Sequence, residues 1–186
     1  MTEPVTLYEA KTHLRLEADS SLPVGFDDEY ILSLITGARV WCEGYLGRSL
    51  VDKTIDYLID DFGLCPIILP SAPIRSITYV KYIDENGTEQ TLANTEYALF
   101  EHNERGYLTK AYGKTWPVVR IERNAVRIRY VAGYATPAEV PQPIKQGILM
   151  LIGDMYENRT GQTNNQLFMN KTAEYLLSPY EMWGGL

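Results

Sequence analysis

Residues 141–159, PQPIKQGILMLIGDMYENR, carry the strongest helical pattern in the C-terminal half of this 186-residue chain. Five apolar side chains recur at three- and four-residue steps: Ile144, Ile148, Leu151, Ile152 and Met155. This spacing puts them on one side of a helix, which the two prolines can begin because a first turn needs no backbone N–H partner. The apolar surface is wider than one stripe, so we expect a core helix that its own chain covers and that leaves room for a second subunit.

Residues 27–46 predict the partner of this helix. Their apolar positions follow the same period, and Gly47 is the expected stop. Three consecutive carboxylates, 27–29, open the helix, where they favour its dipole; no further ligand at metal spacing accompanies them. The residues expected to pack the two helices together are Leu34, Trp41, Ile148, Leu151 and Ile152.

Two shorter helices are predicted near the ends. Thr6 and Glu9 form a capping box for a helix over about 6–16. Residues 160–186 begin with a Gly-, Asn- and Gln-rich segment and predict a flexible tail with a short helix at about 171–178. Four apolar residues of this tail are its expected contacts with a partner: Tyr175, Leu176, Leu177 and Tyr180.

Between the helical segments, from about 50 to 133, the hydrophobic period changes from 3.6 to two. Ile55, Tyr57 and Ile59 alternate with polar residues, and residues 86–87, Asn-Gly, are a favoured hairpin turn. We therefore predict a single α+β connector domain over 1–186, with a small antiparallel β subdomain inserted at 50–133 into a helical core.

Charge is distributed unevenly along the chain. The net charge is −7, and residues 1–104 carry 18 acidic against 7 basic side chains. Residues 105–129 carry seven basic side chains and one acidic side chain, Glu122. Aromatic residues stand among these bases, as on single-strand-binding surfaces, yet solvated strands look the same and the whole chain is acidic. One basic segment in an acidic protein favours protein contacts over nucleic-acid binding.

No pattern of catalytic residues is found. Residues 113–115, Gly-Lys-Thr, lack the glycine that a phosphate-binding loop needs five positions before Gly113. His13 and His102 belong to no triad, and Cys42 and Cys65 are expected to be small buried hydrophobic residues. We predict no enzyme activity, no cofactor and no metal. No apolar run reaches membrane-spanning length and no signal peptide is evident, so we expect a cytoplasmic protein without membrane contact.

Several segments in order resemble the head–tail connector, or adaptor, proteins of long-tailed phages and prophages. They are VTLYEAKTHLRL at 5–16, DDEYILSLITGARVWCEGYLGRSL at 27–50, LPSAPIRSITYVKYIDENGTEQTL at 69–92, AYGKTWP at 111–117, NAVRIRYVAGY at 124–134 and YENR at 156–159. Together with the rest of the helical segment 141–159, which the last of them ends, they cover just over half of the chain. Many such proteins are nearly all helical, so this chain resembles a branch with a β insertion.

The resemblance implies a structural protein of the virion neck that is assembled in the host cytoplasm. It implies a homo-oligomeric ring that docks under the portal protein, lets double-stranded DNA pass, and receives the next neck, stopper or tail-completion protein. Ring assembly requires two different complementary patches per subunit. We expect Arg120, Arg123 and Arg127 to contact an acidic neighbour or the portal.

Two alternatives stay open on the sequence. One is a neck or tail-completion protein of another family with a similar mixed fold. The other is a nucleic-acid-binding module involved in DNA packaging, which would bind DNA tightly and with a steep dependence on salt.

Overall fold

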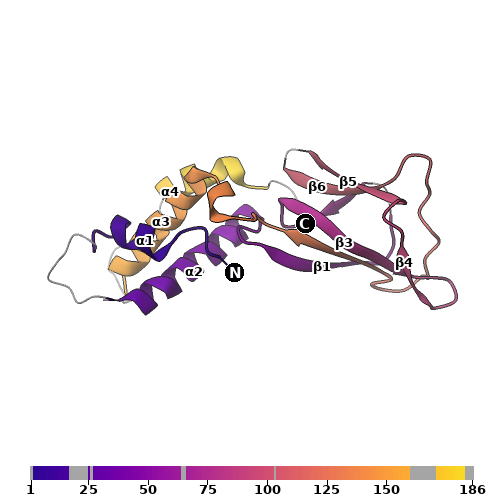
Figure 1. Ribbon diagram of the computed structural model, residues 1–186, viewed down its shortest axis with the longest axis horizontal. Helices are drawn as coiled ribbons and strands as arrows, with labels where there is room; N and C mark the ends of the chain where they lie inside the picture. Colours follow the sequence, from indigo (N-terminus) through magenta and orange to yellow (C-terminus); the bar gives the residue numbers. More distant parts are fainter. Residues whose placement is uncertain are drawn as a thin grey trace. The chain divides into compact units, whose positions relative to one another are not determined.

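The computed structural model describes residues 2–16, 25, 27–63, 66–102, 104–159 and 171–182 (Figure 1). These residues form two compact units. The helical unit contains the chain up to Val51 and from Tyr134 onward, and the β unit spans Asp52–Gly133. The predicted α+β class, with helices on both sides of an antiparallel β insertion in the sequence, is confirmed. The expected flexibility of 160–170 and 183–186, and the expected burial of Cys65, fall outside the described residues.

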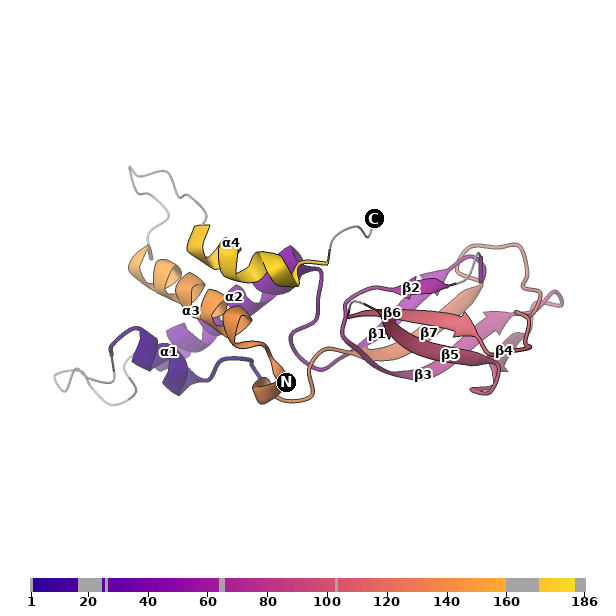
Figure 2. The ribbon, with the colours of Figure 1, turned by 90° about the horizontal axis from the view of Figure 1, so that it is seen from above.

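The helical unit is built on two long helices that pack against each other, α2 and α3, with the shorter α1 and α4 against them. Its elements are α1 (Leu7–His13), α2 (Asp28–Leu46), the 3-10 helix η1 (Pro137–Glu139), α3 (Gln142–Glu157), α4 (Lys171–Leu177) and the 3-10 helix η2 (Ser178–Tyr180). Figure 2 shows α1 and α4 on different sides of the α2–α3 pair.

Local sequence signals set the ends of these helices. The Thr6 side chain accepts a hydrogen bond from the Glu9 amide at 3.1 Å, and the Glu9 carboxylate accepts one from the Thr6 amide at 2.7 Å. The predicted capping box is therefore present. Gly47 ends α2 with φ of 65°, a left-handed conformation that glycine adopts without a Cβ penalty. The start of α1 and the end of α2 therefore lie within a few residues of the positions predicted from the sequence.

The α2–α3 contact forms the centre of the helical core. Ile148 and Ile152 are fully buried, and Leu151 is 8% exposed. Leu34 and Trp41 are partly buried and pack against the same cluster. The structure thus places all five expected core residues in one hydrophobic cluster.

The wide apolar surface of α3 is covered by its own chain. Leu149 is buried, and Met150 and Tyr156 are partly buried against the same core. Because α1, α2 and α4 all contact α3, little of its apolar surface is left for another copy. A contact between subunits at this surface stays a prediction, confined to side chains that are only partly buried, such as Met150 and Tyr156.

The β unit contains two antiparallel sheets rather than the single sheet that the sequence predicted. One has the order β1-β7-β3-β4, and the other has the order β2-β6-β5. Their strands are β1 (Lys53–Ile59), β2 (Ile67–Leu69), β3 (Ile74–Ile83), β4 (Glu89–Leu92), β5 (Tyr97–His102), β6 (Arg105–Lys110) and β7 (Val126–Ala132). Figures 1 and 2 show the sheets as two layers.

A second hydrophobic core lies between these layers. Val80, Ile128 and Tyr130 from the four-stranded sheet pack with Leu108 from the three-stranded sheet, and all four are fully buried. The Tyr130 hydroxyl donates a hydrogen bond to the carbonyl oxygen of Pro70 at 2.8 Å, which satisfies its polar atom. The β unit therefore has a core of its own, and its two outer faces contain no further layer from the unit itself.

Candidate assembly surfaces

Three of the seven bases of the segment 105–129 form ion pairs within the β unit. Lys114 pairs with Glu96 at 2.8 Å, and Arg120 pairs with Glu122 at 3.2 Å. The β unit carries eleven acidic and ten basic side chains, whereas the helical unit carries thirteen acidic and seven basic ones. The acidic excess of the protein therefore belongs to the helical unit, and the basic segment does not form a continuous basic surface.

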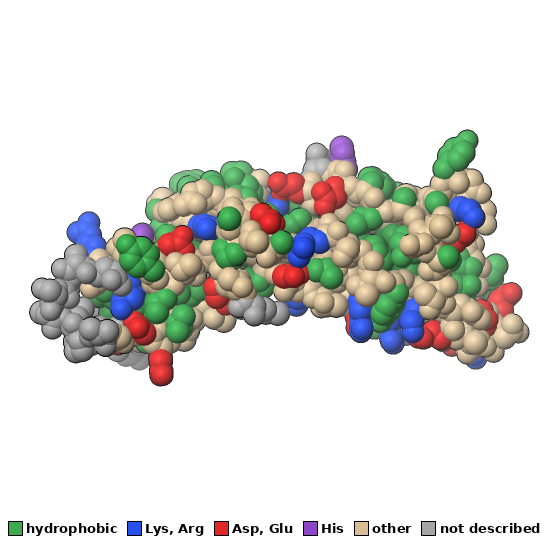
Figure 3. Space-filling model, in the orientation of Figure 1, with side chains coloured by type: hydrophobic (Ala, Val, Ile, Leu, Met, Phe, Trp, Pro, Cys, Tyr) green, Lys and Arg blue, Asp and Glu red, His purple; other side chains and the backbone are tan. Residues whose placement is uncertain are grey.

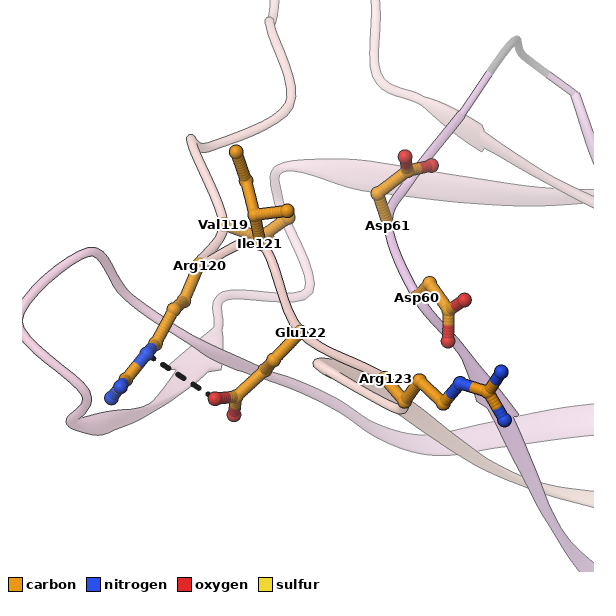
Figure 4. Close-up of a pocket in the computed structure, with 7 residues that line it drawn as sticks. All are labelled: Asp60, Asp61, Val119, Arg120, Ile121, Glu122 and Arg123. Carbon is orange, nitrogen blue, oxygen red and sulfur yellow. Dashed lines mark ion pairs between the residues drawn. The ribbon is translucent and has the colours of Figure 1, made fainter.

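The segment 119–123 borders a cavity of about 380 Å³ at one end of the four-stranded sheet (Figure 4). Its lining includes Arg120 and Arg123 from this segment and Asp60 and Asp61 from the residues after β1. Backbone hydrogen bonds hold the segment on both sides: the Arg120 amide donates to the Ile83 carbonyl at 3.0 Å, and the Asn124 amide donates to Asp60 Oδ1 at 2.9 Å. Ile121 and Val118 are exposed on this loop.

Arg127 belongs to the same end of the sheet. It lines a small neighbouring cavity with Ile83, the residue whose carbonyl holds Arg120. The structure therefore brings the three predicted contact arginines, Arg120, Arg123 and Arg127, to one region of the β unit. Acids and bases are mixed there, which suits a protein partner better than a phosphate backbone.

The outer face of the four-stranded sheet carries an aromatic ring between two cations. Lys81 Nζ lies 5.3 Å and Arg129 Cζ lies 5.0 Å from the centre of the Tyr79 ring. Arg129 donates two hydrogen bonds to Asp56, at 2.7 and 2.6 Å, and these lower the pKa of the Asp56 carboxyl. Figure 3 shows Lys and Arg side chains beside a hydrophobic side chain over this part of the molecule. This face was not anticipated, because its residues come from three separate strands.

The outer face of the three-stranded sheet is apolar. Ile68, Tyr107 and Phe100 are register partners across β2, β6 and β5, so they form one row. Ile68 is 49% and Phe100 is 43% exposed, and the Phe100 and Tyr107 rings stack with centres 5.1 Å apart. Strands β5 and β6 were not predicted from the sequence. The apolar residues at alternate positions, Tyr97 and Leu99, were the signal that could have indicated β5.

The C-terminal residues proposed as anchors divide into two sets. Leu177 is fully buried in the helical core, and a Cβ built on Gly147 would lie 3.0 Å from its Cδ2 atom. Its expected role as a partner contact is wrong, because α4 uses it to pack on α3. Tyr175 is 75% exposed, and Leu176 and Tyr180 are half-buried, so these three side chains keep accessible surface.

A polar cluster joins the start of α2 to the end of α3. Asp27 accepts a hydrogen bond from the Tyr156 hydroxyl at 2.9 Å and pairs with Arg159. Arg159 lies 4.5 Å from the centres of both the Tyr30 and Tyr156 rings. Its hydrogen bond lowers the pKa of the Asp27 carboxyl. Asp27 therefore joins α2 to the end of α3 through Tyr156 and Arg159, and it makes no side-chain cap hydrogen bond on α2.

Catalytic geometry is not evident in the described ranges. No group of three or more His, Cys, Asp or Glu side chains within the described residues could hold a metal ion. Burial raises the pKa of the Cys42 thiol to about 12, which keeps it unreactive. Among the described helices, none has the length and apolar character needed to cross a membrane.

Comparison with solved structures identifies the fold. A chain in the virion of the native gene transfer agent (GTA) particle matches with a TM-score of 0.79 and 22% identity, covering 98% of this chain and 92% of that one. A chain in the neck of the empty GTA particle, computed with C6 symmetry, matches with a TM-score of 0.73 and 20% identity over 98% and 92% of the two chains. A chain in the neck of the native GTA particle, computed with C12 symmetry, matches with a TM-score of 0.67 and 20% identity, covering 100% of this chain and 96% of that one.

Sequence comparison adds the family. The chain is 35% identical over 48 residues to Head completion protein gp6 of Enterobacteria phage HK97, a match that spans 26% of this chain and less than half, 44%, of that protein. The chain therefore has the fold of these GTA neck chains. Residues 15–178 match the profile of the family described as head completion protein, and the chain belongs to this family.

Proposed function

We propose that this protein forms a closed ring in the virion neck, under the portal protein, through which double-stranded DNA passes. Membership of the head completion protein family over residues 15–178 carries this proposal. Chains of similar fold come from necks computed with C6 and C12 symmetry, which supports a ring, here proposed to have twelve copies. Its assembly in the host cytoplasm is part of the same proposal. The next neck, stopper or tail-completion protein then binds to the ring.

The charge distribution suits this role. Duplex DNA carries one negative charge per about 1.7 Å of its axis, so a protein that guides it must avoid tight phosphate contacts. The helical unit has thirteen acidic and only seven basic side chains. If this unit lines the passage, the genome meets little opposite charge and can slide.

Two accessible regions are proposed to contact the portal or an adjacent subunit. One is the end of the β unit that carries Arg120, Arg123 and Arg127. The other comprises Tyr175, Leu176 and Tyr180 of the C-terminal helices. Exposed charges such as these arginines set encounter rate and register more than final affinity, because solvent and salt screen them.

A DNA-packaging module that binds nucleic acid is the weaker candidate. Three of the seven bases in 105–129 pair with carboxylates of the β unit, at Glu96, Glu122 and Asp56. A DNA-binding groove needs bases that are free to release counterions from phosphates, and these three are already neutralised.

Negative-stain imaging of the protein, alone and mixed with its portal, tests the proposal. Rings alone, or rings seated on the portal, are the expected result. A triple variant with Arg120→Glu, Arg123→Glu and Arg127→Glu should impair docking or assembly without changing the circular dichroism spectrum. A monomer that never associates with itself or with the portal, yet binds duplex DNA tightly, would refute the proposal.

A further inference from the structure

We infer that Arg48 is a positioning residue for docking, because it holds Tyr180 in the place from which Tyr180 meets the portal. This inference rests on the proposed function, in which Tyr175, Leu176 and Tyr180 form an accessible contact region. All the residues involved belong to the helical unit.

Arg48 follows the end of α2 directly and is buried. Gly47 ends the helix with φ of 65°, and the Arg48 amide donates a hydrogen bond back to the Glu43 carbonyl oxygen at 3.2 Å. Only 5% of Arg48 is exposed. A buried guanidinium group is costly unless it is hydrogen-bonded, and an apolar side chain would fill the same space at a lower desolvation cost. An arginine at this place therefore indicates a role besides filling the core.

The Arg48 side chain contacts the C-terminal 3-10 helix η2. Its Nε atom donates a hydrogen bond to the Tyr180 carbonyl oxygen at 2.5 Å. Hydrogen bonds from an ionised donor are roughly twice as strong as those between neutral groups. The Arg48 Cζ atom also lies 6.0 Å from the centre of the Tyr180 ring, at the outer limit of a cation–π contact. One arginine thus holds the backbone of Tyr180 and borders its ring.

The last turn of α2 holds the residues that follow Tyr180. The last carbonyl groups of a helix have no partner within the helix itself. One of them, the Leu46 carbonyl, accepts a hydrogen bond from the Met182 amide at 2.9 Å. A Cβ built on Gly47 would lie 3.5 Å from the Met182 Cβ, which is ordinary van der Waals contact. Residues 46–48 and 180–182 are therefore joined by two hydrogen bonds, with one donor from each segment.

This arrangement orders a contact residue before its partner arrives. Helix η2 has only three residues, Ser178–Tyr180, and a 3-10 helix of this length has little stability of its own. The two hydrogen bonds therefore decide where Tyr180 lies, while its half-buried side chain keeps accessible surface. Tyrosine is enriched among the residues that dominate binding energy, and an ordered side chain loses less conformational entropy on binding.

Hydrogen exchange tests the positioning in the full-length protein without a partner. Arg48→Met keeps an unbranched apolar side chain and removes the donor. We expect the Met182 amide to exchange about tenfold faster or more, and the amide of the buried Ile148 in α3 to change much less. Arg48→Lys keeps the charge without the guanidinium geometry and should give a smaller increase, so it provides the test if R48M does not fold. Exchange at Met182 as slow as in the wild type in both variants would overturn the inference.

A double-mutant cycle on portal docking tests what the positioning does. We expect Arg48→Met and Tyr180→Ala each to raise the Kd for the portal by about tenfold, and the double variant to bind no more weakly than Y180A alone, because Arg48 acts through Tyr180. Arg39→Met is the matched control, since Arg39 is also buried but pairs with Glu3 and Glu43. It should lower thermal stability and leave the docking of the folded protein unchanged.

The outcomes separate this inference from the proposed function. Docking of R48M as tight as that of the wild type, or additive losses from R48M and Y180A, would overturn the positioning role and leave the proposed function intact. A wild-type protein that does not bind the portal would overturn the docking in the proposed function and this inference together, whatever the exchange at Met182 shows.

Discussion

Leu177→Ala and Tyr175→Ala form a matched pair that separates the structural role of α4 from its role in docking. The two residues are neighbours on one short helix, yet Leu177 is fully buried and Tyr175 is 75% exposed. We expect L177A to destabilise the helical unit strongly and Y175A to leave stability unchanged within about 0.5 kcal/mol. Y175A should instead weaken docking to the portal.

The magnitude for L177A follows from the packing around it. Buried Leu→Ala changes cost about 2–5 kcal/mol, and the cost rises with the size of the cavity that remains. The neighbour of Leu177 on α3 is Gly147, which has no side chain to move into the space. The upper half of the range, about 3–5 kcal/mol, is therefore expected.

Guanidinium unfolding followed by far-ultraviolet circular dichroism measures this value, and sedimentation with the portal measures docking. Gly147→Ala supplies the control, because its methyl group would lie 3.0 Å from Leu177 Cδ2 in the wild type but would enter the vacated space in L177A. We expect the double variant to be more stable than L177A alone, since alanine also favours the helix. A loss below about 1 kcal/mol for L177A would refute the placement of α4 in the core.

Three further outcomes are expected. Gly106→Ala should destabilise the β unit by about 1–3 kcal/mol or more, because the new Cβ would lie 2.2 Å from Ile74 Cγ1; a neutral effect in thermal unfolding would contradict the sheet-to-sheet packing. The pKa of the Asp27 carboxyl is lower in the folded state than its unfolded value of 3.8. Its contribution to the free energy of unfolding is therefore complete above pH 3.8 and is lost as the pH falls through the folded pKa. Asp27→Asn should thus reduce the loss of unfolding free energy between neutral and acidic pH. An unchanged loss would show that the Asp27–Arg159 ion pair does not cause it. Ring assembly followed by light scattering should slow as salt rises from about 0.05 to 0.5 M, and a rate independent of salt would exclude steering by exposed charges.

The helical unit could be predicted because its signals are local. The capping box at Thr6, the stop at Gly47 and the 3.6-residue period each act over one or two turns, and the structure agrees with them. The partners of Leu177 and of the wide α3 surface could not be predicted. Both depend on α4 returning to α3 after the segment 160–170, a contact between residues far apart in the sequence that no local pattern encodes.

The basic segment shows why bases that are clustered in the sequence do not form a basic patch on the surface. Antiparallel pairing places β7 beside β1, so Arg129 meets Asp56, 73 residues earlier in the chain, and Lys114 likewise pairs with an acid before residue 105, Glu96. Arg127, two residues before Arg129, faces Leu58 in the same register and stays without an ion pair within the described residues. Alternation along one strand thus leaves a single cation on an otherwise neutralised face. A surface with one guanidinium outside an ion pair beside a half-buried Tyr79 ring suits a neighbouring protein, whereas a phosphate backbone requires several free cations in a row. This difference is the physical reason for proposing a protein, and not DNA, as the partner of the β unit.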